Sequence, residues 1–320
     1  MSWQILQIQG SNGLLRYNQG HIEWCKYKTL ITGLHVNHRP VSGNTNLKPE
    51  LNAPITAMSQ TLLSVQWHRP LLDVRAVVLS GFGNTIDCEL LTAIGQTDTI
   101  ILHLDHSFKV ATWTMRPFRI VNPVVYQNQH EATSAKQTYL WELLLGAKYR
   151  FQEHVAGAAL GVAKDRITEI EGSVASRYFK HLFRMLDYWG TRDQDATDPV
   201  NACLNYGYTI LTTLVHRGLI IAGLDPCWGV GHKYRTRSFA FVYDVVEPIR
   251  GWADQYLLEL YKKLGRVSLQ EYKAGFVKFL ASNEVVNGLG KTRADWIDEL
   301  CRSVASYYGN KFARTIITPR

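Results

Sequence analysis

The chain has 320 residues, of which 46% are hydrophobic, so the sequence predicts a packed globular protein and excludes disorder throughout the chain. Lysine and arginine outnumber aspartate and glutamate by 35 to 27, a modest excess that is compatible with an anionic polymer as partner but does not by itself predict one. The N-terminus lacks a signal-peptide pattern, no apolar run reaches the roughly 20 residues that span a bilayer, and the five cysteines include no CxxC pair. These features predict a cytoplasmic protein without a membrane partner.

Short runs rich in β-branched and aromatic residues predict strands in the first third of the chain. Turn residues such as Asn18-Gln19-Gly20 separate these runs. Residues 38–55 contain three prolines and predict a loop, whereas residues 87–96 predict one short helix. The strands are expected at 3–9, 21–27, 29–36, 62–67, 75–81, 99–105 and 108–116.

The apolar pattern then changes to a helical period. Asp198 followed by Pro199 is typical of a helix start, and Gly223 and Gly265 are typical of helix ends. Helices are expected at 135–159, 165–189, 199–223, 237–265, 268–282 and 293–309.

This change of period divides the chain. Residues 117–125 carry two prolines and predict a linker between a strand-rich and a helical part. We therefore predict an α+β fold of two domains, a small N-terminal β domain (1–116) followed by an all-α C-terminal catalytic domain (126–320).

An acidic residue interrupts the apolar face of the helix expected at 165–189. Glu171 lies four residues after Ile167 and three before Val174, so it shares their face. A carboxylate in that position is costly to desolvate unless it is paired or bound to a cation. A structural salt bridge explains the position as well as a functional site does.

More candidate ligands lie between residues 229 and 250. His232 follows a Gly-Val-Gly turn, whose glycines allow close backbone approach and predict an imidazole at the lip of a cleft. Asp244 and Glu247 are three residues apart, so they face the same way on the next expected helix. The residues around them are too apolar for a mostly exposed segment.

One histidine and two or three carboxylates on separate helices can hold a divalent metal, and this ligand type favours Mg²⁺ or Mn²⁺. The nearby Lys233, Arg235 and Arg237 suit a phosphate substrate. The pattern indicates metal-dependent phosphodiester chemistry on nucleic acid, because that chemistry needs a Lewis acid at the phosphate. A non-catalytic DNA-binding scaffold and a metallo-hydrolase of small phosphoesters remain alternatives.

The region between residues 165 and 260 carries an ordered series of short motifs. They are Glu171-Gly172, Pro199-Val200-Asn201-Ala202, Asn205-Tyr206-Gly207-Tyr208, Ala222-Gly223-Leu224-Asp225-Pro226, Gly231-His232 and Asp244-Val245-Val246-Glu247-Pro248-Ile249-Arg250. This series, with its gaps, resembles the CRISPR-associated protein 1 family, the integrases and endonucleases that acquire new spacers in antiviral defence.

The resemblance implies that Glu171, His232 and Glu247 hold Mg²⁺ or Mn²⁺. It implies that Asp244 is a further catalytic residue, either an alternative ligand or a support for the ligands. The 3′-hydroxyl of spacer DNA would then attack a phosphodiester at the edge of the repeat array, by transesterification. The residues expected to contact DNA are Lys233, Arg235, Arg237 and Arg250.

The resemblance also implies partners. They are spacer-precursor DNA, the CRISPR repeat, a second copy of the chain bound through the β domain, and a companion, CRISPR-associated protein 2. The chain departs from the family at residues 38–55, which look longer than the usual hairpin region. A mobile-element relative with the same metal triad, a transposon integrase, is a further alternative.

Overall fold

The computed structural model describes most of the chain. It leaves out the predicted strand at 29–36 and the loop at 38–55, and of the predicted site residues it leaves out Lys233, Arg235 and Arg237. The described residues are 4–9, 13–28, 62–81, 83–105, 110–117, 120–157, 159–161, 171–232, 239–286 and 289–309.

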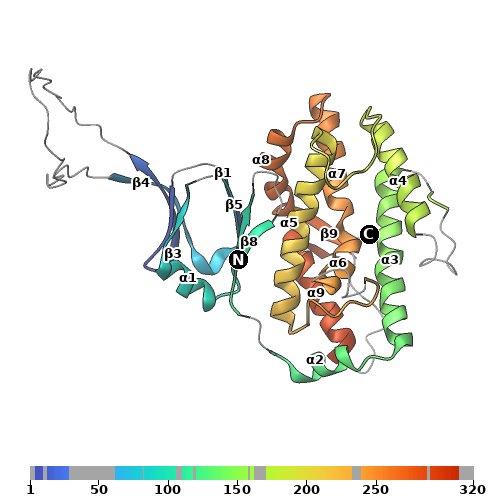
Figure 1. Cartoon of the computed structure of the whole chain (residues 1–320), viewed down its shortest axis with the longest axis horizontal. Helices are drawn as coiled ribbons and strands as arrows, with labels where there is room; N and C mark the ends of the chain where they lie inside the picture. Colours follow the sequence, from blue (N-terminus) through green and yellow to red (C-terminus); the bar gives the residue numbers. More distant parts are fainter. Residues whose placement is uncertain are drawn as a thin grey trace, which may run out of the picture.

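Strands dominate the N-terminal part, as predicted (Figure 1). They are β1 (Gln4–Gln9), β2 (Gly13–Asn18), β3 (His21–Lys28), β4 (Leu62–Pro70), β5 (Val74–Ser80), β6 (Thr85–Ile86), β7 (Ile100–Leu104) and β8 (Val110–Thr114). The short helix α1 (Cys88–Gly95) forms where one was expected, after the 3-10 turn η1 (Leu71–Asp73). Strands β2 and β6 were not predicted.

The described strands of this part form two four-stranded sheets. One has the order β1-β5-β7-β8, in which β1, β5 and β7 run parallel and β8 runs antiparallel. The other has the order β4-β3-β2-β6. Strand β5 is buried at every position, which is typical of a strand covered on both faces.

The two faces of the first sheet meet different neighbours. Ala76 and Val78 of β5 belong to the large hydrophobic cluster that contains the helices, whereas Val77 and Leu79 belong to a smaller cluster with the second sheet and α1. Alternate residues of a strand point to opposite faces, so this sheet is a middle layer. The strand-rich and helical parts therefore share one core.

Helices dominate the rest of the chain, as predicted (Figure 1). They are α2 (Pro123–His130), α3 (Ser134–Ala156), α4 (Glu171–Met185), α5 (Pro199–Ala222), α6 (Ala240–Val246), α7 (Gly251–Leu264), α8 (Leu269–Leu280) and α9 (Arg293–Gly309). Asp198 caps α5 through the backbone N–H groups of Val200 and Asn201, and Gly223 and Gly265 end their helices in the left-handed conformation.

Two details differ from the predicted all-α C-terminal domain. A hairpin of β9 (Asn283–Val286) and β10 (Leu289–Thr292) lies between α8 and α9, so the domain is not all-α. The helix expected at 237–265 is divided by the 3-10 turn η3 (Glu247–Ile249). Pro248 lies in that turn, and a proline cannot donate the hydrogen bond that would continue a helix.

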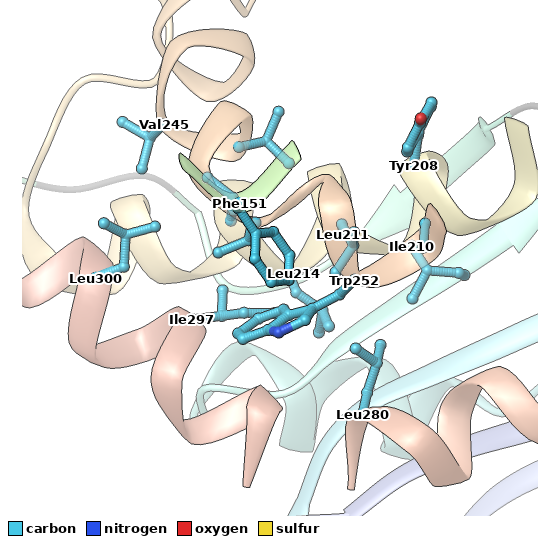
Figure 2. Packing of buried hydrophobic residues seen from close by; sticks show 14 of the residues in the cluster. Phe151, Tyr208, Ile210, Leu211, Leu214, Val245, Trp252, Leu280, Ile297 and Leu300 are labelled. Atoms are coloured by element: carbon cyan, nitrogen blue, oxygen red, sulfur yellow. The ribbon is translucent and has the colours of Figure 1, made fainter. Parts of the chain in front are cut away.

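The centre of the helical part is apolar and closely packed. Figure 2 shows Trp252 of α7 near Ile297 of α9 and Leu280 of α8, and all three side chains are fully buried. Helix α5 is buried along nearly its whole length and contacts α6, α7, α8 and α9. This packing fixes the elements that carry Asp244 and Glu247, which belong to α6 and η3.

Candidate metal centre

Two of the predicted metal ligands converge on one cation. Glu171 is the first residue of α4, and Glu247 is the first residue of η3. The Nζ atom of Lys148, on α3, lies 2.8 Å from Oε1 of Glu171 and 2.7 Å from Oε2 of Glu247. The structure thus brings these two carboxylates together, as the sequence predicted, around an ammonium group that the sequence analysis did not single out.

Glu247 is held in its ionised form. Its side chain is only 2% exposed, and its second oxygen lies 3.0 Å from Nη1 of Arg250. Burial alone would raise the pKa of this carboxyl group, but Arg250 and Lys148 outweigh the effect, so the pKa lies below its ordinary value. Lys148 stays protonated for the matching reason, because Glu247 and Glu171 raise its pKa more than burial lowers it.

Asp244 holds the loop that carries His232. Its Oδ2 accepts hydrogen bonds from the backbone N–H groups of Val230 (2.6 Å) and Gly231 (3.1 Å), and its Oδ1 accepts one from that of His232 (2.8 Å). Oδ1 also lies 2.7 Å from Nδ1 of the His232 ring. Because Asp244 is fully buried and both oxygens have partners, its contacts are those of a residue that positions His232.

The glycines before His232 are required by close contacts. A Cβ atom on Gly231 would lie 2.4 Å from the ring of Trp141, and one on Gly229 would lie 2.4 Å from the carbonyl oxygen of His232. The histidine side chain is 32% exposed. The close backbone approach that the Gly-Val-Gly motif predicted is therefore present, with the imidazole at the surface of a cavity.

The geometry of His232 leaves one ring nitrogen for a ligand. With Nδ1 facing the Asp244 carboxylate, Nδ1–H donates and Nε2 carries the free lone pair. A carboxylate behind a histidine commonly fixes the tautomer and ring orientation of a metal-binding imidazole in this way.

Glu171, His232, Glu247 and Arg250 line one cavity of about 1310 Å³. Arg192 and Tyr208 line it as well. The guanidinium groups of Arg192 and Arg250 lie 5.4 and 5.0 Å from the centre of the Tyr208 ring. The cavity lining thus includes three carboxylates, two imidazoles and two arginines, since Asp195 and His216 line it too. The arginines suit an anionic substrate bound beside a cation.

Arg192 is held in place by α5. Its Nη1 donates to Oδ1 of Asn201 at 3.0 Å, and its Nη2 donates to Oδ1 of Asn205 at 2.6 Å. Sequence reasoning missed Arg192, although both asparagines belong to the motifs quoted above. It missed Lys148 as well, although Lys148 lies four residues after Leu144 on an apolar helical face. A charged residue in an apolar face is the same signal that singled out Glu171.

Glu171, Glu247 and His232 offer carboxylate oxygens and one imidazole nitrogen. This combination of ligand atoms suits a hard divalent cation. Two of the carboxylates already face a single positive charge at hydrogen-bonding distance. Within the described ranges, no three or more His, Cys, Asp or Glu side chains are gathered closely enough to hold a metal as they stand. Metal binding therefore requires local rearrangement, and Lys148 is the group that lies between the carboxylates.

Residues 144–270, which are less than half of the chain, match the family model described as CRISPR associated protein Cas1. This segment is similar to the Cas1 family. The resemblance read from the sequence is thereby confirmed. The segment contains Lys148 and the predicted catalytic residues Glu171, His232, Asp244 and Glu247.

A curated relative agrees with the Cas1 assignment. The chain is 30% identical over 170 residues to the CRISPR-associated endonuclease Cas1 2 of Pyrobaculum aerophilum. The alignment covers 52% of this chain and 57% of that protein, so the chain matches little more than half of its relative's length.

Solved structures share the fold over nearly the whole chain. A casposase bound to an integration product superposes with a TM-score of 0.74 at 16% identity, covering 98% of this chain and 93% of that one. A chain of a Cas6-RT-Cas1–Cas2 complex superposes with a TM-score of 0.68 at 13% identity, covering 99% of this chain and 36% of that one. At these identities the likeness shows a Cas1-like fold with mixed α and β content. None of the helices within the described residues is both long and apolar enough to span a bilayer.

Proposed function

We propose that the chain is a divalent-metal-dependent DNA endonuclease and integrase of CRISPR adaptation, acting in the cytoplasm. The observation that carries the proposal is the convergence of Glu171 and Glu247 on one cation, in a cavity that His232 also lines, within a Cas1 domain. Mg²⁺ or Mn²⁺ would be held by these two carboxylates and Nε2 of His232. Bound there, the ion would supply a Lewis acid for the phosphate oxygens.

The protein's own residues have distinct tasks in this proposal. Asp244 keeps the imidazole of His232 oriented, with its proton on Nδ1. Arg250 and Arg192 are placed to contact the phosphate and its developing negative charge, which fixed cations stabilise. Lys233, Arg235 and Arg237 remain predicted DNA contacts, because they lie outside the described residues.

The proposed reaction exchanges one phosphodiester for another. The 3′-hydroxyl oxygen of a spacer DNA end forms a bond to phosphorus at the edge of the repeat and gives up its proton. The bond from that phosphorus to the 3′-oxygen of the neighbouring nucleotide breaks, and the displaced strand takes up a proton and leaves with a new 3′-hydroxyl. Water in place of the spacer end gives hydrolysis, which is the endonuclease activity. In-line positioning of the two oxygens supplies much of the acceleration in such exchanges.

The proposed partners are spacer-precursor DNA, the CRISPR repeat, a second copy of this chain and Cas2. The names of the two structural neighbours support DNA and Cas2 as partners. One neighbour is bound to an integration product, and the other is part of a complex with Cas2. The homodimer is carried over from the family resemblance.

A transposon-type integrase is the second candidate, because the casposase superposes over nearly the whole chain. The two functions differ in their target DNA. Joining at a CRISPR repeat edge in the presence of Cas2 favours the first function, whereas joining of transposon-end DNA to targets without a repeat favours the second.

Cleavage of a branched DNA by the purified protein tests the shared chemistry. We expect cleavage by the parent with Mn²⁺, none with EDTA, and none by Glu171→Ala with either. Glu142→Ala is the matched control, because Glu142 is an exposed glutamate on α3, and it should cleave like the parent. Cleavage by Glu171→Ala at the parental rate would refute the proposed metal site. DNA binding without metal-dependent cleavage would favour a scaffold, and turnover of small phosphoesters alone would favour a hydrolase.

A further inference from the structure

The pocket around Glu171 and Glu247 is electrically balanced by protein groups alone. Lys148 contacts both carboxylates, and Arg250 contacts the remaining oxygen of Glu247. Two negative and two positive side chains give a local charge near zero. Lys148 is only 8% exposed, so bulk water contributes little to holding its charge.

A metal ion bound by these carboxylates would compete with Lys148. The ammonium group contacts Oε1 of Glu171 and Oε2 of Glu247, so it occupies one oxygen of each carboxylate that the metal would need. An ammonium group that kept its place would lie against a divalent cation in a poorly solvated pocket, where like charges repel strongly. The lysine would therefore have to leave the carboxylates and find another anion.

The cavity provides room for that anion. It extends from Glu171 and Glu247 past Arg250 to Tyr208 and Arg192. Once a metal neutralises Glu171 and Glu247, two arginines of the lining face one remaining carboxylate, Asp195. A DNA phosphate is the anion that the proposed substrate brings. The four carbons of a lysine side chain allow its ammonium group to turn from one anion to another without movement of helix α3.

We propose that Lys148 is the counter-cation of Glu171 and Glu247 when no metal is bound, and that it transfers to a DNA phosphate when the metal binds. This inference rests on the proposed function, since it takes the same carboxylates as the metal ligands. Its consequence is coupling, because the metal must displace Lys148 when DNA is absent, whereas DNA offers Lys148 a new partner. Metal and DNA then raise each other's affinity by the same factor.

Calorimetric titration of Mn²⁺ into three proteins tests the coupling, each with and without a short thymidine oligonucleotide. The parent should bind Mn²⁺ about 10-fold more tightly when the oligonucleotide is present, which is a typical coupling factor. Lys148→Met should bind Mn²⁺ about 10-fold more tightly than the parent without DNA, and should gain little from DNA. Lys180→Met, which removes an exposed lysine of α4, should behave like the parent.

Two results would overturn the inference while leaving the proposed function intact. Both assume that the parent binds Mn²⁺ and cleaves DNA. One is that Lys148→Met binds Mn²⁺ no more tightly than the parent does. The other is an unchanged gain from the oligonucleotide in that variant. A parent that neither binds Mn²⁺ nor cleaves DNA would overturn the proposed function and the inference together.

The reactivity of Lys148 in the parent gives a second test that does not depend on the folding of a variant. Reductive methylation read by mass spectrometry should label Lys148 slowly in the apoprotein, several-fold faster with Mg²⁺, and slowly again with Mg²⁺ and the oligonucleotide. Lys180 should be labelled equally in the first two conditions. Constant labelling of Lys148 at a Mg²⁺ concentration that calorimetry shows to be saturating would contradict the transfer.

Discussion

Among the described residues, two ionic clusters have a similar composition but different surroundings. In the first, Lys148 and Arg250 neutralise Glu171 and Glu247 on the wall of a large cavity. The second joins the middle sheet to the helices. In it, Arg75 of β5 contacts Asp295 and Asp298 of α9 at 2.7 and 3.1 Å, and Arg217 of α5 contacts Asp298 at 2.9 Å.

The comparison shows what separates a structural ion pair from a candidate site. In the second cluster both arginines are 2% exposed, and none of its four residues lines the large cavity. A guanidinium group in that setting links two elements and cannot easily exchange partners. In the first cluster the central cation is a lysine whose two carboxylate partners line a cavity, so other ions can replace it there.

The largest expected effect is the loss of catalysis in His232→Ala. The variant keeps the buried Asp244 bonded to the backbone N–H groups of Val230 and Gly231, so the fold should survive. Cleavage of branched DNA with Mn²⁺ should fall by about 10³-fold or more, because an electrostatic group at the reacting phosphate is lost.

The matched control is His154→Ala, which removes an exposed histidine of α3. It should cleave at the parental rate. Parental cleavage by His232→Ala would remove this residue from the site and leave the first cluster as a structural ion pair like the second.

Asp298→Ala should have the largest effect on stability. It leaves two buried arginines without one of their carboxylate partners, and breaking such a buried network costs about 3 kcal/mol of unfolding free energy. Urea denaturation measures this cost. The variant should still cleave DNA at temperatures where it remains folded.

Glu171→Gln should show the opposite pattern. Its side chain is 36% exposed and Lys148 keeps its contact with Glu247, so the unfolding free energy should change by less than about 1 kcal/mol while cleavage is lost. If Glu171→Gln lowered the unfolding free energy as much as Asp298→Ala does, the two clusters would not differ in their contribution to stability.

Another buried carboxylate, Asp254, sharpens the comparison, because its hydrogen-bond partners are neutral hydroxyl groups. Asp254 accepts hydrogen bonds from the hydroxyl groups of Tyr178 (2.6 Å) and Tyr208 (2.5 Å). Burial raises its pKa from 3.8 to about 6, and these hydrogen bonds only partly oppose the rise. The contrast with Glu247, whose pKa is lowered, follows from the absence of a cation in direct contact with Asp254 among the described groups.

The sign of the resulting pH dependence follows from the raised pKa. The folded state holds the Asp254 proton more tightly than the unfolded state, so its contribution to stability is fully present below pH 3.8 and is lost as the pH rises through about 6. In Asp254→Asn the side chain does not titrate, so the variant does not lose this contribution to stability as the pH rises. Its unfolding free energy relative to the parent should rise by about 2 kcal/mol between pH 4 and pH 7, measured by urea denaturation across that range. A difference that does not vary with pH would show that Asp254 titrates alike in both states.

The smallest expected effect concerns DNA affinity. Arg192→Gln removes one cation from the cavity wall, so binding of an oligonucleotide should weaken a few-fold and the slope of log affinity against log salt should fall by about 1. Fluorescence anisotropy over a range of salt concentrations measures both. Arg150→Gln, an exposed arginine on α3, is the control, and an equal effect there would indicate general attraction by net charge.

The helical part could be predicted well because its signals are strong and local. Proline after Asp198, the glycines at 223 and 265, and long apolar periods mark its helices. The break at Pro248 was overlooked because the apolar period continues through it. Strand β2 and the β9–β10 hairpin were overlooked because short strands depend on the partners that they meet, and their sequences carry little period of their own.

The candidate site could be predicted only in part. Glu171, His232 and Glu247 were found because a carboxylate in an apolar face and a histidine after glycines are unusual in themselves. Lys148 and Arg192 were not found, because their importance lies in contacts between different elements. Lys148 of α3 contacts Glu171 of α4 and Glu247 of η3, and Arg192 lies over the ring of Tyr208 of α5. Periodicity describes one element at a time, whereas charge pairing depends on how elements pack.

The central claim is that Glu171, His232 and Glu247 bind one divalent metal. The most direct test is a crystal structure of the protein soaked in Mn²⁺, with anomalous scattering recorded at the manganese edge. We predict a peak within about 2.4 Å of a Glu171 oxygen, a Glu247 oxygen and Nε2 of His232, with the Lys148 ammonium displaced from the two carboxylates. A peak bound by other residues, or a well-ordered site in which Lys148 keeps both contacts and no peak appears, would contradict the account.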